Sequence, residues 1–266
     1  GGKRIKGLGC SGGIGPGLRT TSLLVDDQIL IDAGTGVGDL SLSQMQGIRQ
    51  VFITHSHLDH VCGLAFMADN LFDLIDTPVD VYASTETITA LKTHLFNWTL
   101  WPDFSKLPSE EHGLLRFHEI PVGQARQING KTITPFQVLH TVPAVGYSLQ
   151  APAGTFAFTG DTFANEHLWA HLNSLPRLDK LMIDVAFTDE QAELGRLSRH
   201  FTPKLLGQEL AKLRHRPELL LTHHKPGCEA PIERECALAL ADWPHRHLRR
   251  PPPLHPARHG PNHRAR

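Results

Sequence analysis

The sequence predicts an α/β protein in which two sheets pack face to face with helices outside, a four-layer αβ/βα sandwich. Three observations predict this class. Short strands bounded by glycine open the chain, strand and helix patterns then alternate, and the same order returns in the second half. The chain has 266 residues, 40% hydrophobic and 20% charged, which suits one large globular domain or two small ones.

The first half begins with strands at 4–10, 22–26 and 29–36, and the second and third are expected to form a hairpin around Asp26 and Asp27. A short helix is expected over 39–46. The continuous apolar run at 50–55 predicts a buried strand, and a helix over about 60–74 follows it. Residues 79–84 predict another strand. A helix over 85–95 should begin at a cap formed by Ser84 or Thr85.

Residues 97–113, "NWTLWPDFSKLPSEEHG", lack any period and predict an irregular insertion. Strands are then expected at 115–122, 132–141, 144–150 and 154–161, followed by a helix over 165–172 and a strand over 179–187. Residues 202–216 give the clearest amphipathic helix, with Thr202 as its cap and Pro203 in its first turn. The last strand is expected at 218–227 and the last helix at 232–243.

The end of the chain has a different composition from the rest. Its sequence, "PHRHLRRPPPLHPARHGPNHRAR", is rich in Pro, Arg and His and has no apolar period. Such a segment cannot bury a core. We therefore expect one domain over residues 1–242 and a disordered tail over 243–266.

Charge and cysteine content restrict the expected binding partners and cellular compartment. The formal net charge is −1, so no overall field favours nucleic acid or an anionic membrane, and the chain has no run of about 18 apolar residues that could span one. The four cysteines are scattered without CxxC pairs, which predicts reduced thiols and a cytoplasmic protein. Because the chain opens "GGKRIKGLG" without Met, a removed leader remains an alternative.

The stretch "FITHSHLDHVCGL" contains four candidate metal ligands. His55, His57, Asp59 and His60 follow directly on an apolar strand. Imidazoles are costly to bury there unless their nitrogens are occupied. His55 and His57 lie two apart and should point the same way, whereas Asp59 and His60 are adjacent and should diverge. This arrangement suits two metal ions better than one.

Further ligands follow other apolar strands. His140 ends "FQVLH", Asp161 ends "FAFTGD", and His223 and His224 end "LLLTHH". One site would then combine His55, His57, His140 and Asp161. The other would combine Asp59, His60, Asp161 and either His223 or His224. Asp161 has two oxygens and can bridge two cations about 3.5–4 Å apart. Zinc is the expected metal, with manganese or iron as alternatives.

The pattern HxHxDH, a distant His, a Gly-Asp pair and a final His resembles the metallo-β-lactamase superfamily of hydrolases over about residues 3–240. The resemblance implies that fold and favours His223 over His224 as the ligand. "LGCSGGIGPGLRTTSLLV", "HSHLDHVCGL" and "SRHFTPKLLGQEL" are similar to the class II 3′,5′-cyclic-nucleotide phosphodiesterases. "VLHTVPAVGY" and the context of His200 also resemble the tRNA 3′-processing endonucleases.

The resemblance implies a dinuclear metal-dependent phosphodiesterase. Two divalent ions would lower the pKa of a shared water, and the resulting hydroxide would attack phosphorus of a 3′,5′-cyclic nucleotide to give the 5′-monophosphate. Asp59 and Asp161 would fix the metals and orient the hydroxide. The histidine matching His200 contacts the scissile phosphate in those families, so His200 is expected to bind substrate and protonate the leaving 3′-oxygen.

Two further segments are candidates for substrate contact. The glycine loop 11–17 can turn the chain or bring backbone amides to a phosphate, and Ser11 and Thr21 are the side chains expected to bind substrate. The aromatic residues in 96–104 suit either a wall that stacks a base or core packing: Phe96, Trp98, Trp101 and Phe104.

Other functions fit the same ligands. A thioester hydrolase of the glyoxalase II type or a lactonase is the main alternative, and a tRNA 3′-endonuclease is less favoured because the chain lacks a long basic arm. A non-enzymatic metal-binding scaffold is disfavoured because every ligand is present. The expected partner is a small phosphodiester rather than nucleic acid or a membrane, and dimers are common in this branch of the superfamily.

Overall fold

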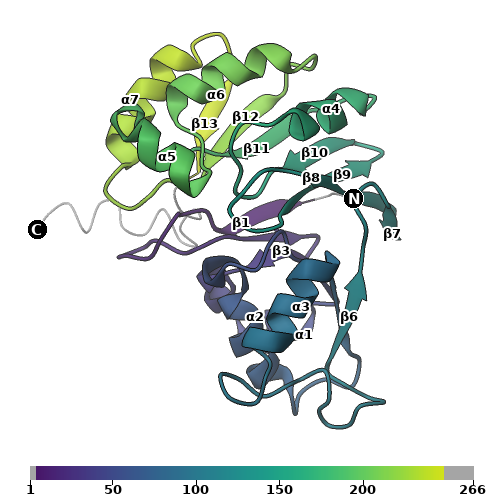
Figure 1. Cartoon of the computed structure of the whole chain (residues 1–266). Coiled ribbons are helices and arrows are strands. Elements are labelled where there is room, and N and C mark those ends of the chain that lie inside the picture. The colour runs from purple at the N-terminus through teal and green to yellow at the C-terminus, as the bar shows by residue number, and fades with distance from the viewer. Residues whose placement is uncertain (1–3, 249–266) are drawn as a thin grey trace, which may run out of the picture.

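A computed structural model of the chain describes residues 4–248, and its first half builds one sheet with helices on one side (Figure 1). The sheet has six strands in chain order: β1 (Ile5–Gly9), β2 (Ser22–Val25), β3 (Ile29–Ala33), β4 (Gln50–Phe52), β5 (Val79–Ala83) and β6 (Leu115–Glu119). Strands β1 to β3 pair antiparallel, and β3 to β6 pair parallel. The elements between them are η1 (Thr35–Asp39), α1 (Leu42–Gln46), α2 (Leu58–Leu71) and α3 (Thr85–His94).

The second half builds a sheet of seven strands in the order β13-β12-β11-β10-β9-β8-β7. These strands are β7 (Arg126–Ile128), β8 (Lys131–Gln137), β9 (Val145–Ala151), β10 (Gly154–Phe158), β11 (Lys180–Asp184), β12 (Glu218–Thr222) and β13 (His245–His247). The helical elements over its outer face are α4 (Glu166–Ser174), η2 (Asp189–Gln191), α5 (Ala192–Ser198), α6 (Pro203–Glu209), η3 (Leu210–Lys212) and α7 (Glu229–Ala239).

The two sheets and the helices outside each form four layers, and apolar side chains fill the three spaces between them. One cluster, which includes Leu30, Val51 and Leu64, joins the first sheet to its helices. A second, which includes Trp169, Leu181 and Leu219, joins the second sheet to α4, α6 and α7. A third lies between the sheets and contains the alternate side chains of the same strands: Leu23, Val25, Ile29, Ile31, Phe52, Val145, Tyr147, Leu149, Phe156, Phe158, Met182 and Leu220. The predicted four-layer sandwich is thereby confirmed.

Parallel pairing brings several strand ends to one edge of the sandwich. Strands β3, β4 and β5 are parallel neighbours in the first sheet, and β10, β11 and β12 are parallel neighbours in the second. The carboxyl ends of parallel strands meet on one side of a sheet, and the loops beyond them can converge there. This is why residues far apart in sequence become neighbours.

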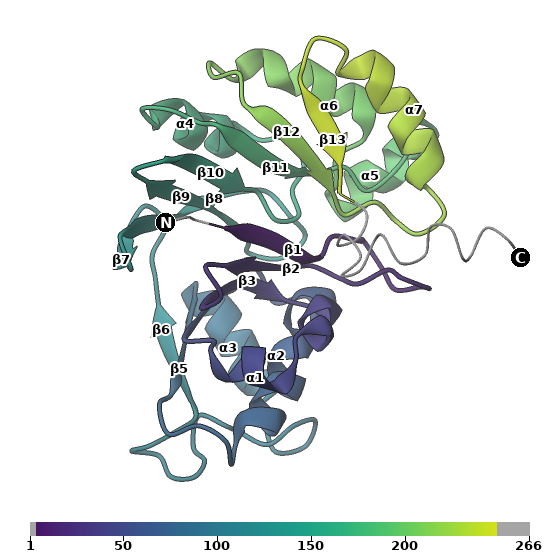
Figure 2. The same cartoon turned by 180° about the vertical axis from the view of Figure 1, so that it is seen from behind.

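Some expectations were wrong in detail. Residues 243–248 do not begin a disordered tail: β13 pairs parallel with β12, Trp243 packs against the second cluster and Leu248 against the third (Figure 2). The rest of the expected tail, 249–266, lies outside the described residues. The helix expected over 202–216 ends at Glu209 and continues only as one 3₁₀ turn. Helix α5 and strand β7 were not predicted.

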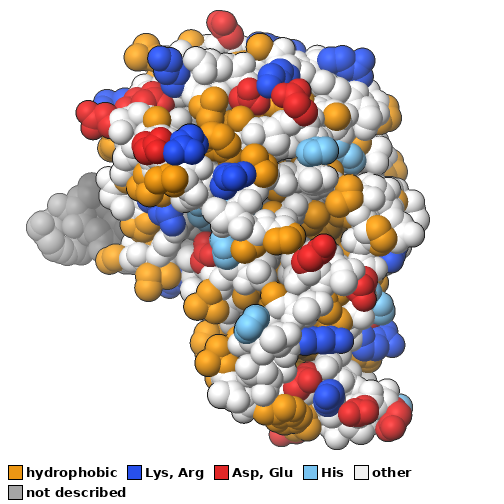
Figure 3. All heavy atoms as spheres, in the orientation of Figure 1, with side chains coloured by type: hydrophobic (Ala, Val, Ile, Leu, Met, Phe, Trp, Pro, Cys, Tyr) orange, Lys and Arg blue, Asp and Glu red, His pale blue; other side chains and the backbone are white. Residues whose placement is uncertain are grey.

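Other expectations were confirmed. No helix or strand is assigned between α3 and β6, where the irregular insertion was expected. Ser84 caps α3 by accepting a hydrogen bond from the Thr87 amide. Lys, Arg, Asp and Glu side chains are intermixed on the face in Figure 3, which accords with the net charge of −1. Among the described helices, none is long and apolar enough to cross a membrane.

Candidate metal centre

Short loops at the strand ends position the predicted ligands. His55 and His57 follow β4, and His57 is the N-cap residue of α2, so Asp59 and His60 lie in the first turn of that helix. Close packing fixes this turn against the loop after β3. A Cβ on Gly34 would lie 2.1 Å from the Asp59 carbonyl oxygen, so only glycine permits the approach.

The first group of predicted ligands comes together as expected: His55, His57, His140 and Asp161. The His140 Nε2 and His57 Nδ1 atoms lie 3.2 Å apart. The Asp161 Oδ2 atom lies 3.5 Å from the His55 Nε2 and 3.6 Å from the His140 Nε2. Three imidazole nitrogens and one carboxylate oxygen therefore face a common point.

The second group lies beside the first and shares Asp161 with it: Asp59, His60, Asp161 and His223. The His60 Nε2 lies 3.2 Å from the Asp161 Oδ2, and the His223 Nε2 lies 3.3 Å from the Asp161 Oδ1. The His223 Nε2 is also 3.3 Å from the Asp59 Oδ2. The two Asp161 oxygens thus face both groups.

These spacings fit cations. Ligand atoms about 2.0–2.1 Å from a tetrahedral zinc ion lie about 3.3 Å from one another, close to the separations found in both groups. The His55 Nε2 is buried and has no hydrogen-bond partner among the described residues, which is costly unless a cation occupies its lone pair. All seven predicted ligands therefore fit a pair of divalent metal ions.

The electrostatics also favour cations. Burial lowers the pKa of His140 to about 3, so its imidazole is neutral at physiological pH and can donate a lone pair. Burial alone would raise the pKa of Asp161, but His223 and His60 outweigh it and hold that pKa well below its usual range. Burial alone would lower the pKa of His60, yet Asp161 and two other carboxylates raise it well above its usual value. The carboxylates of the second group thus attract positive charge, which a proton on His60 or a bound cation can supply.

Asp32 supports the second group and was not predicted. Its carboxylate is fully buried at the end of β3 and accepts bonds from the Thr54 amide at 2.7 Å and the Thr54 hydroxyl at 2.7 Å. It also accepts from the His60 Nδ1 at 2.7 Å, which turns the His60 Nε2 toward the metal group. Asp32 has a φ of 59°, a strained value for a residue with a side chain.

Asp184 was also missed, and it holds His200. The His200 Nδ1 donates to the Asp184 Oδ2 at 2.7 Å, and the Thr162 amide donates to the same oxygen at 3.1 Å. The His200 ring centroid lies 5.0 Å from that of His140 and 5.1 Å from that of His223. Burial alone would lower the pKa of His200, but Asp184 outweighs it and raises that pKa. His200 is therefore a buried imidazole beside both groups, and Asp184 favours its protonated form.

The structure separates the two adjacent histidines after β12. His223 joins the second group, whereas His224 turns away from it. The His224 Nδ1 donates to the Val185 carbonyl at 2.6 Å, and its Nε2 lies 2.9 Å from the His247 Nδ1. Both His224 nitrogens are therefore occupied, which leaves His223 as the ligand.

The other residues expected to bind substrate, Ser11 and Thr21, do not belong to either metal group. Ser11 is buried, and its loop is fixed to the chain beside the second group because the Gly12 amide donates to the His224 carbonyl at 2.9 Å. Thr21 is buried, and its hydroxyl has no partner among the described residues. Contact of Ser11 and Thr21 with substrate stays a prediction.

The aromatic residues of 96–104 do not form one wall. Phe96 and Phe104 are buried in the first core cluster, and the Trp101 indole donates to the Ala65 carbonyl at 2.8 Å. Trp98 is exposed. Core packing, the other predicted arrangement, accounts for the two phenylalanines.

Three comparisons with known proteins agree with this geometry. The model of the beta-lactamase superfamily domain matches residues 27–224. A probable 3′,5′-cyclic-nucleotide phosphodiesterase of Yersinia pestis is 28% identical over 183 residues, which cover 63% of this chain but only 52% of that protein. A 3′,5′-cyclic-nucleotide phosphodiesterase of Aliivibrio fischeri is 26% identical over 254 residues, covering 77% of this chain and 74% of the relative.

A solved structure shows the same architecture. Unliganded yeast PDE1 superposes with a TM-score of 0.75 at 18% identity, covering 91% of this chain and 96% of that one. At this identity the likeness establishes the fold alone.

Proposed function

Because the chain belongs to the metallo-β-lactamase superfamily, we propose that it is a metal-dependent phosphodiesterase that hydrolyses a 3′,5′-cyclic nucleotide to the 5′-monophosphate. The substrate class is supported by the probable 3′,5′-cyclic-nucleotide phosphodiesterase of Yersinia pestis and the 3′,5′-cyclic-nucleotide phosphodiesterase of Aliivibrio fischeri. The match spans about half of the Yersinia protein, so the proposed substrate also depends on the geometry of the site.

The buried pair of Asp184 and His200 is the observation that favours a phosphodiester. Cleavage of a phosphodiester expels an alkoxide, which needs a proton as it leaves. The Asp184 carboxylate favours the protonated form of His200, and its bond to Nδ1 leaves Nε2 free to reach a substrate. Thiolate, the leaving group of a thioester, depends much less on protonation. The Asp184 and His200 pair therefore favours a substrate with an oxygen leaving group.

The seven ligands would hold two divalent cations, for which zinc is the best fit because the sites combine imidazoles with carboxylates. When bound, such cations supply a water of lowered pKa and positive charge for the phosphate oxygens. Asp59 and Asp161 aim their oxygens at this centre and orient the groups that react there. Asp32 fixes the ring of His60, and Asp184 fixes the ring of His200.

The direct test is turnover by the purified protein supplied with zinc or manganese. The panel contains cyclic AMP, cyclic GMP, bis-p-nitrophenyl phosphate, a glutathione thioester and a lactone, and the nucleotide product is identified by chromatography. We expect 5′-monophosphate from a cyclic nucleotide and loss of activity with a chelator. Faster hydrolysis of the thioester or lactone than of every diester would refute the proposal.

A further inference from the structure

A cavity of about 600 Å³ lies between the two sheets, at the edge opposite the metal centre. It is lined by the first residues of β10 and β11, Gly154 and Lys180, whereas Asp161 follows the carboxyl end of β10 and Asp184 ends β11. Its volume falls within the range of about 300–1,000 Å³ that is usual for small-molecule sites. The metal centre does not account for it.

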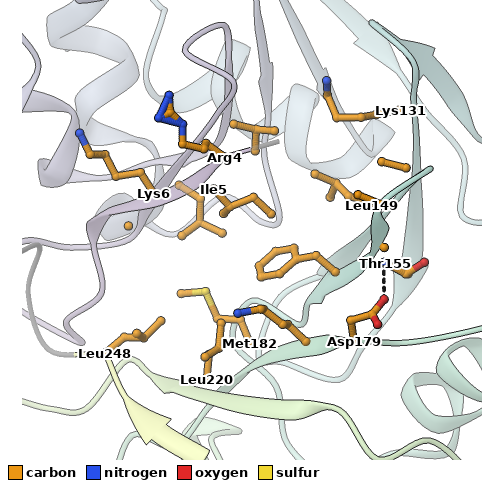
Figure 4. Close-up of a pocket in the computed structure, with 18 of the residues that line it drawn as sticks. Arg4, Ile5, Lys6, Lys131, Leu149, Thr155, Asp179, Met182, Leu220 and Leu248 are labelled. Carbon is orange, nitrogen blue, oxygen red and sulfur yellow. Dashed lines mark hydrogen bonds between the residues drawn. The ribbon is translucent and has the colours of Figure 1, made fainter. Parts of the chain in front are cut away.

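The interior of the cavity is apolar. Figure 4 shows Ile5, Leu149, Met182 and Leu220 around it, with Leu248 at one side. One polar group in the wall, the Thr155 amide, already donates to the Asp179 carboxylate at 2.8 Å. Water in such a space finds few hydrogen-bond partners, so an apolar ligand would displace it favourably.

The margin of the cavity is cationic. Figure 4 shows the charged ends of Arg4, Lys6 and Lys131 at the outside, while their carbon stems approach the lining. In the part of the chain that the structure describes, the ion pairs include no carboxylate partner for the Arg4 or Lys6 side chain. Long cationic side chains can cover apolar surface and keep their charge in water.

The carboxylates near this margin are already paired. Asp26 binds the Lys131 ammonium at 2.5 Å, and Asp179 binds the Arg177 guanidinium at 2.7 Å. Glu218 is shared by two lining cations, Lys180 and Arg246, each at 3.3 Å. Positive charge therefore exceeds negative charge around an apolar interior.

We propose that this cavity binds an aliphatic monocarboxylate, with its chain between the sheets and its carboxylate among the cations at the margin. A neutral apolar compound would gain no attraction from the excess positive charge, and a cationic amphiphile would be repelled by it. The sequence that follows Leu248 begins Arg249, Arg250 and is itself cationic, so the same repulsion disfavours it as the occupant.

Calorimetric titration of the full chain with dodecanoate, below its micellar concentration, tests the proposal. Dodecylammonium and dodecanol are the probes of matched length. We expect one dodecanoate per chain and binding at least tenfold weaker for both other probes. This experiment needs neither metal nor turnover, so its outcome is independent of the proposed phosphodiesterase activity.

Two variants locate the site. Ala151 lines the cavity at a half-buried position, so Ala151→Trp should fill it and weaken dodecanoate at least tenfold. The double variant Arg4→Glu with Lys6→Glu should also weaken dodecanoate binding at least tenfold, because it reverses two positive charges at the margin. The matched controls are Ala211→Trp and the pair Lys106→Glu with Lys204→Glu, all at exposed positions that do not line the cavity.

Four results would overturn the proposal. Three are no binding of dodecanoate, binding as tight for dodecanol or dodecylammonium, and affinity that the Ala151→Trp variant leaves unchanged. The fourth is loss of affinity with Ala151→Trp but not with the charge reversal, which would show that the cations at the margin do not hold the carboxylate.

Discussion

The His200 Nδ1 atom lies 2.7 Å from the Asp184 Oδ2 atom, and both side chains are buried beside the metal centre. The carboxylate sits at the end of β11, while the imidazole follows α5, so two separate elements meet to form this pair. The pair fixes the tautomer of His200, because Nδ1 must carry the proton that is donated to Asp184. It is the part of the site that a metal ligand set alone does not explain.

Replacing His200 with Ala should reduce turnover by an amount that depends on the leaving group of the substrate. Turnover of a cyclic nucleotide should fall about 10²–10⁴-fold, because its ribose oxygen needs a proton. Turnover of bis-p-nitrophenyl phosphate should fall less than about tenfold, because p-nitrophenolate leaves without one. His167→Ala, an exposed histidine on α4, is the control. Equal losses on both substrates would refute the role of His200 as proton donor.

Asp184→Asn should change the pH profile of kcat. The proposed mechanism requires the acid form of His200, so we expect activity on a cyclic nucleotide to fall as pH rises through the His200 pKa, which Asp184 raises. Without the carboxylate that pKa drops, and the alkaline limb should move to lower pH by at least about one unit. An alkaline limb at the same pH in both proteins would show that His200 does not govern it.

Asp32→Asn should weaken metal binding although it replaces none of the metal ligands, because Asp32 holds the ring of His60. The amide cannot accept all three bonds that Asp32 accepts from Thr54 and His60. Loss of such a support costs about 10–100-fold in metal affinity, which competition with a chromophoric chelator measures. Asp69→Asn, exposed on α2, is the control, and an affinity equal to that control would contradict the assignment.

Asp161→Ala and His57→Ala should differ in the number of metals retained. Asp161 faces both groups, whereas His57 faces the first alone. Elemental analysis after dialysis should find two metals per chain in the unaltered protein and about one in His57→Ala. Asp161→Ala should retain fewer than His57→Ala. The sharing of Asp161 would be refuted if Asp161→Ala kept both metals.

His224 should make the protein sensitive to acid. Burial lowers its folded-state pKa to about 4, whereas an unfolded histidine titrates near 6.5. As pH falls below about 6.5 the unfolded chain takes up the proton first, so stability present above that pH is lost toward pH 4, by about 3 kcal/mol. Urea unfolding of the metal-free protein between pH 7 and 4 measures this loss.

The matched variant for that experiment is His224→Gln, which keeps polar atoms but does not titrate in this range. It should be less stable at pH 7 and lose less stability on acidification. A pH dependence identical to that of the unaltered protein would show that another group is responsible.

Sequence reasoning predicted the metal centre well because its ligands obey one local rule: a polar residue directly follows an apolar strand. His55, His140, Asp161 and His223 all fit this rule. Asp32 in "ILID" and Asp184 in "LMID" fit it too, but were overlooked. A lone carboxylate there also suits a turn, and its role depends on a partner such as His60, 28 residues away.

The errors in the predicted fold also come from contacts between residues that are distant in sequence. Strand β13 is three residues long and polar, and it forms only because β12 offers a parallel edge. Nothing in "HRH" itself indicates a strand, so composition predicted a tail. Likewise Phe96 and Phe104 could only be assigned to the core once the first sheet and its helices were in place.

The most direct test of the account is anomalous diffraction from crystals grown with zinc, recorded on both sides of the zinc absorption edge. We predict two peaks per chain about 3.5–4 Å apart, one among His55, His57 and His140, the other among Asp59, His60 and His223, with Asp161 between them. A single peak, or peaks away from these side chains, would contradict the account.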